Sequence, residues 1–146
     1  MTSDKTISRV IELKGLTTEQ LETEARRTAD ALRQEQERLV ALEKEFQRRV
    51  SDFSEMQTCG PVAGKDIDIF YSYFMHLNSQ IARQKSAVLR RQEEFEKNRK
   101  AVLEAYKEQR MIELYHNRVV HAKAREAGAR EQKEADERFL QRRREG

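Results

Sequence analysis

Apolar residues recur along the first part of the chain at alternating steps of three and four residues. Charged and amide side chains fill most of the positions between them. Such a seven-residue repeat is typical of helices that pack in a left-handed coiled coil. It predicts a helix over residues 4–58. The seam positions are Ala25, Leu32, Leu39, Phe46 and Phe53 on one line, and Leu21, Leu42 and Met56 on the other.

Gly15 leaves two interpretations of how this helix begins. Ile7 and Ile11 carry the repeat backward through the glycine, which favours one continuous helix. Thr17 could instead be an N-cap, with Gln20 as its capping-box partner. We expect the continuous helix, because a glycine inside a helix costs only about 1 kcal/mol.

The repeat returns after residue 66 and predicts a second helix over residues 66–142. Its apolar positions become sparse through Ile112 and Val119, and beyond Val120 only Phe139 and Leu140 are large and apolar. The stronger positions are Ile67, Phe70, Phe74, Leu77, Ile81, Val88, Phe95 and Val102.

Residues 59–65 are predicted to reverse the chain. Pro61 cannot continue a helix, and it disfavours helix at the residue before it. Gly60 can end the first helix, and Gly64 can take a positive φ. Asp66 or Asp68 can cap the second helix.

A turn centred between residues 61 and 62 pairs residue i with residue 123 − i. This pairing sets Phe53 opposite Phe70 and Phe46 opposite Leu77. The predicted fold is therefore all-α, with residues 1–146 forming a single domain. That domain is an antiparallel two-helix coiled-coil hairpin.

The pairing also predicts where the hairpin weakens. Polar seam positions, namely Thr28, Glu35, Arg91 and Asn98, should loosen it away from the turn. By this pairing, residues near 120 of the second helix lie opposite the start of the first helix. The remaining residues of the longer second helix, roughly 25, therefore overhang by about 40 Å at the helical rise. The repeat does not decide whether the seam forms within one chain or between two.

Composition and charge narrow the classes of function. Charged residues make up 38% of the chain and aromatic residues 7%. Residues 117–146 hold nine Lys and Arg against six Asp and Glu, and these acids would repel the phosphates of a nucleic acid. No apolar run approaches the roughly 20 residues of a membrane span. We therefore expect neither nucleic-acid binding nor direct membrane insertion.

The sequence lacks the signals of catalytic, cofactor and metal sites. Gly60 and Gly64-Lys65 are separated by three residues, whereas a phosphate-binding P-loop has four, and Asp66 stands where that loop has Ser or Thr. His116 and His121 are five residues apart, which puts them on different faces of a helix. A helical hairpin also has no cavity of the size that ligand sites need. We expect no catalytic residues, no cofactor and no metal.

Two local motifs resemble the FliJ family of flagellar export-apparatus proteins. Residues Glu131-Gln132-Lys133-Glu134-Ala135-Asp136-Glu137, followed by Arg142, resemble that family's E-Q-K-x-x-D-E…R ending. Tyr73-Phe74-Met75-His76-Leu77 with Ile81 resembles its aromatic-x-x-x-Leu-x-x-x-Ile run. The resemblance implies an antiparallel coiled coil and a non-enzymatic stalk of the flagellar type III export machine.

The resemblance also implies partners and a location. The partners are the hexameric export ATPase, the export-gate membrane protein and export chaperones, at the cytoplasmic face of the inner membrane. The ATPase-ring contact would be formed by Glu131, Gln132, Lys133, Asp136, Glu137 and Arg142. The export-gate contact would be formed by Tyr73, Leu77, Gln80 and Gln84. The alternatives are the equivalent stalk of a virulence secretion system and a dimeric coiled-coil scaffold.

Overall fold

The computed structural model describes residues 2–145, and side chains from residue 5 onward. It contains α1 (Thr2–Thr58) and α2 (Gly64–Glu145), which pack against each other, and no strand among the described residues. The antiparallel two-helix hairpin is therefore confirmed, and the seam forms within one chain.

The first helix runs through Gly15 without a break. The Thr17 side chain donates a hydrogen bond to the carbonyl oxygen of Leu13 at 2.9 Å, four residues earlier in the same helix. This is how a threonine inside a helix bonds, so the alternative in which Thr17 caps a new helix is wrong.

The turn contains one glycine that its conformation requires. Gly60 has a φ of +140°, where a side chain would be strained. Gly64 does not have a positive φ, contrary to expectation, because α2 has already begun there. The carbonyl of Ala63 accepts the first backbone bonds, from the amides of Asp66 at 3.0 Å and Ile67 at 3.2 Å.

The expected capping by Asp66 or Asp68 is therefore wrong, because both residues lie inside α2. Asp66 lies in the first turn of that helix. Its negative charge interacts favourably with the positive, N-terminal end of the helix dipole.

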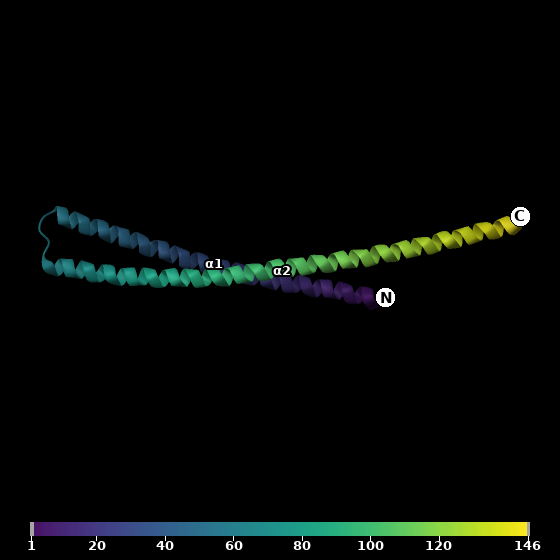
Figure 1. Ribbon diagram of the computed structural model, residues 1–146, viewed down its shortest axis with the longest axis horizontal. Helices are drawn as coiled ribbons and strands as arrows, with labels where there is room; N and C mark the ends of the chain where they lie inside the picture. The colour runs from purple at the N-terminus through teal and green to yellow at the C-terminus, as the bar shows by residue number, and fades with distance from the viewer. Residues whose placement is uncertain (1, 146) are drawn as a thin grey trace. The chain divides into compact units, whose positions relative to one another are not determined.

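The contacts of the chain define two units, and each is described by itself. Unit 2 comprises Gln20–Val102, with the turn and the parts of α1 and α2 that flank it. Figure 1 shows these two segments joined by the turn and running in opposite directions. Unit 1 comprises the first 19 residues and everything from Leu103 onward.

An aromatic cluster packs the seam of unit 2 next to the turn. The ring centroids of Phe53 and Phe70 lie 5.1 Å apart, which confirms that pair. Phe46 packs against Phe74 at 5.7 Å, one turn away from its expected partner Leu77. Phe74 also contacts Phe53 and Phe70, so one ring joins both helices. Leu77 continues the core and is 2% exposed.

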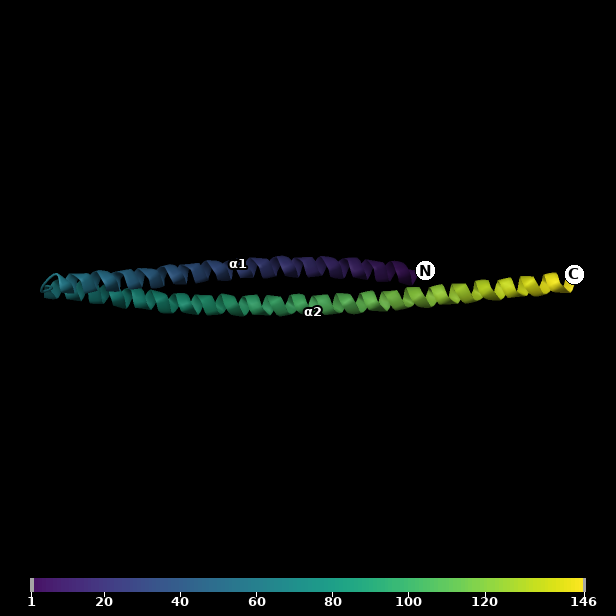
Figure 2. The ribbon, with the colours of Figure 1, turned by 90° about the horizontal axis from the view of Figure 1, so that it is seen from above.

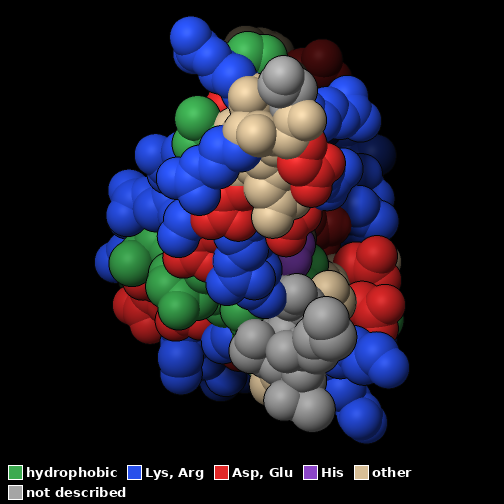
Figure 3. Space-filling model, turned by 90° about the vertical axis from the view of Figure 1, so that its right-hand side faces the viewer, with side chains coloured by type: hydrophobic (Ala, Val, Ile, Leu, Met, Phe, Trp, Pro, Cys, Tyr) green, Lys and Arg blue, Asp and Glu red, His purple; other side chains and the backbone are tan. Residues whose placement is uncertain are grey.

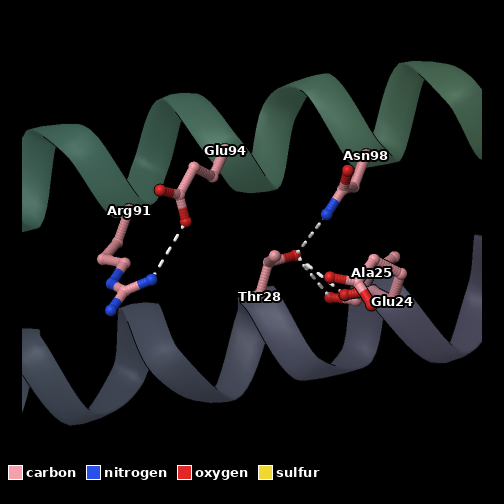
Figure 4. A network of polar contacts seen from close by, with 6 residues as sticks. All are labelled: Glu24, Ala25, Thr28, Arg91, Glu94 and Asn98. Carbon is pink, nitrogen blue, oxygen red and sulfur yellow. Dashed lines mark hydrogen bonds and ion pairs between the residues drawn. The ribbon is translucent and has the colours of Figure 1, made fainter.

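Polar residues in the seam farther from the turn form hydrogen bonds between the two helices. Gln84 donates to the side chain and the backbone carbonyl of Glu35. Asn98 donates to the hydroxyl of Thr28 at 3.2 Å (Figure 4). The expected loosening is wrong for these positions, because each polar residue finds a polar partner on the other helix.

Arg91 behaves differently from these polar pairs. It is exposed and forms an ion pair with Glu94 of its own helix at 3.1 Å (Figure 4). Its charged group therefore lies in solvent and not in the seam.

Unit 1 contains the paired ends of α1 and α2 and an exposed continuation of α2. The register holds here, because Lys14 of α1 reaches Glu108 of α2 at 3.0 Å. Val119 is the last half-buried residue, and every described residue from His121 onward is exposed. Figure 2 shows α2 continuing past the N-terminal end of α1. This is the overhang that the pairing arithmetic predicts.

Candidate functional site

The overhanging part of α2, residues 121–145, is the first candidate surface. It is defined here as the C-terminal segment, and it holds all the residues predicted to contact the ATPase ring. Its own ion pairs and hydrogen bonds run along the helix, with Arg138 to Glu134 at 3.5 Å and Gln132 to Asp136 at 3.3 Å. Such exposed pairs contribute little to stability.

The predicted ring-contact residues do not form one stripe. At 100° per residue, Glu131 and Arg142 point to one side of the helix. Lys133 and Glu137 point to the opposite side. Seen from the end of unit 1, Lys and Arg side chains interleave with Asp and Glu (Figure 3). The segment therefore presents charges of both signs around its circumference.

Phe139 and Leu140 are the apolar exceptions in the C-terminal segment. They are 64% and 53% exposed, and α1 provides no seam at this point. By helical spacing they share a side with Gln132 and Asp136. Sequence reasoning noted their size but did not count them as contact residues. The available signal was a pair of large apolar residues in a stretch that the pairing arithmetic places beyond the end of α1.

The second candidate surface is the predicted export-gate contact in unit 2. Its four residues form one line along α2, but the structure divides them by accessibility. Leu77 and Gln84 are buried at 2% and 8% exposure, and Gln84 is bonded to Glu35. Neither side chain can reach a partner while the hairpin is closed.

Tyr73 and Gln80 lie beside the seam, at the edge of the helix pair. The hydroxyl of Tyr73 donates to Glu45 at 2.6 Å, and the guanidinium of Arg49 lies 5.4 Å from the centre of its ring. Gln80 is exposed. The structure therefore brings only Tyr73 and Gln80 of the predicted set to the surface.

The features of an enzyme site are sparse. Among the described residues, no group of three or more His, Cys, Asp or Glu side chains is placed to hold a metal ion. Cys59 is exposed in the turn and forms no disulfide. Across the part of the chain that the structure describes, no helix has the length and apolar content needed to span a bilayer.

Comparison with known families identifies the family of this chain. The family described as the flagellar FliJ protein matches residues 3–145. No curated protein and no solved structure matches the chain. The match covers both helices and the turn. The chain belongs to the FliJ family, whose members are non-catalytic components of the flagellar protein-export apparatus.

Proposed function

We propose that this protein is the stalk of the flagellar type III export apparatus, and that its C-terminal segment inserts into the hexameric export ATPase. The observation that supports this most is the overhang itself. This segment of about 25 residues, or roughly 37 Å at the helical rise, carries charges on all sides, and all of its residues are exposed. An isolated polar helix is marginally stable in water, so a surrounding partner would stabilise it.

A hexameric ring would contact an inserted helix from every side. The distribution of Glu131, Lys133, Glu137 and Arg142 around the helix suits this geometry, whereas a flat partner would need them on one face. Exposed ion pairs contribute about 0–1 kcal/mol each, so such contacts would bind the helix weakly and reversibly. Phe139 and Leu140 would supply the apolar contacts that position it.

The test is ATP turnover by the purified export ATPase with and without the full-length protein. We expect turnover to rise and the two proteins to co-purify, because insertion would favour ring assembly. An ATPase whose turnover and elution are both unaffected by a molar excess of the protein would contradict the proposal.

We further propose that the same protein contacts the export gate through Tyr73 and Gln80. Leu77 and Gln84 would then act indirectly, by holding the seam beneath that surface. Replacing Gln80 with Arg should weaken co-purification with the cytoplasmic domain of the gate protein. Asn78→Arg is the matched control, since Asn78 is also exposed on α2 but points away from Gln80. Equal retention of both variants would contradict this contact.

The remaining partners follow from the family assignment. Export chaperones would bind a surface of the stalk outside the ring. The location would be the cytoplasmic face of the inner membrane, where the gate protein lies. These proposals rest on membership of the family and on no contact seen in the structure.

A further inference from the structure

Unit 1 carries a second exposed surface that is apolar and lies apart from the C-terminal segment. It has two short rows, with Val10 and Leu13 three residues apart on α1, and Met111 and Tyr115 four residues apart on α2. The most exposed member, Met111, is 70% exposed. This surface is defined as the unit 1 apolar face and consists of these four residues.

The register places both rows on the same flank of unit 1. With the seam at positions a and d of the seven-residue repeat, these four residues occupy positions c and g. Position g of each helix borders the same edge of an antiparallel pair, as the bond between Tyr73 and Glu45 shows in unit 2. The Lys14–Glu108 ion pair marks this edge in unit 1. Tyr115 lies seven residues beyond Glu108, and Val10 lies one turn before Lys14.

Charges around the unit 1 apolar face favour one kind of partner. Arg118 and Arg125 continue the row of Met111 at seven-residue steps. Among the described residues, neither of these two arginines takes part in an ion pair. The acids of this flank are already paired, Glu104 with Lys107 at 3.7 Å and Glu108 with Lys14 at 3.0 Å. The face is therefore bordered by uncompensated positive charge.

We propose that the unit 1 apolar face binds an amphipathic helix of a partner protein whose apolar stripe is flanked by Asp and Glu. Apolar residues from both helices along one edge of the pair can receive the i, i+3 and i+4 apolar stripe of such a helix. Exposed apolar residues that gather on one flank mark interaction sites. A second copy of this chain would bring arginines against arginines, so charge complementarity disfavours self-association through this face.

The experiment is selection of helical peptides from a displayed library against the full-length protein. The winning peptide is then titrated by fluorescence anisotropy. We expect selected peptides to carry an apolar stripe flanked by acids. The double variant Leu13→Ser/Tyr115→Ser should weaken binding at least about tenfold. Arg118→Glu should also weaken it, whereas exchange of the peptide's acids for lysines should abolish binding.

The matched control is Leu103→Ser/Tyr106→Ser. These residues have similar exposure and lie on the opposite flank of α2, at positions b and e. Circular dichroism should show both double variants to be as helical as the wild type, because all four positions are exposed. The proposal is overturned by a library that yields no binder, by binders with basic flanks, or by binding that both double variants weaken equally. It is also overturned by a wild-type dimer that Leu13→Ser/Tyr115→Ser dissociates.

Discussion

Removing residues 125–146 should abolish the rise in ATP turnover that the full-length protein produces in the export ATPase. The truncation removes the ring-contact residues and both exposed apolar side chains of the C-terminal segment. It leaves the seam intact, because the last half-buried residue is Val119. The measurement is the initial rate of phosphate release at several concentrations of each protein.

A finer variant separates the apolar contacts from the charges. Phe139→Ser/Leu140→Ser should weaken association with the ATPase at least about tenfold, since burying such side chains is worth about 1.5–3 kcal/mol each. Val120→Ser is the control, because Val120 is also exposed and precedes the C-terminal segment. A truncated protein that stimulates the ATPase as strongly as the full chain would place the contact elsewhere.

Replacing Phe74 with Ala should lower the free energy of unfolding by about 3 kcal/mol. Its ring lies 5.7 Å from that of Phe46, and 6.2 Å from those of Phe53 and Phe70. A hairpin of two helices has little core besides this cluster, and only Leu77 and Ile81 are buried apolar residues among those described. The substitution would therefore remove a large share of the packing that joins the two helices.

Urea unfolding followed by circular dichroism would measure this change. Tyr71→Ala is the matched control, because Tyr71 is a neighbouring aromatic residue that is 65% exposed, and its loss should change stability by no more than about 0.5 kcal/mol. If the two variants unfolded at the same urea concentration, the aromatic cluster would not be the main source of stability near the turn.

The helices and their register could be predicted from sequence because both depend on local patterns. A seven-residue repeat needs only apolar residues at regular spacing, and Gly60-Pro61 fixes the point of reversal. The pairing arithmetic is confirmed near the turn by Phe53 with Phe70, and in unit 1 by Lys14 with Glu108. Details at the start of α2 were wrong, because the carbonyl of Ala63 begins the helix before either aspartate.

The candidate contacts were less predictable, because accessibility depends on both helices together. Leu77 and Gln84 belong to a motif that suggested a partner surface, yet they lie in the seam. A single helix cannot reveal whether a glutamine will meet a glutamate across the interface, as Gln84 meets Glu35.

The sequence by itself determined two helices, one reversal and an overhang of the second helix. These follow from the period of apolar residues and from the chain length on each side of Pro61. Only the tertiary structure decided which polar seam residues form hydrogen bonds with one another. It alone also decided which residues of the predicted export-gate contact remain exposed. It also placed Val10 and Leu13 on the same flank as Met111 and Tyr115. The physical reason is that burial and shared faces arise from the pairing of two helices, and each helix contributes only half of every contact.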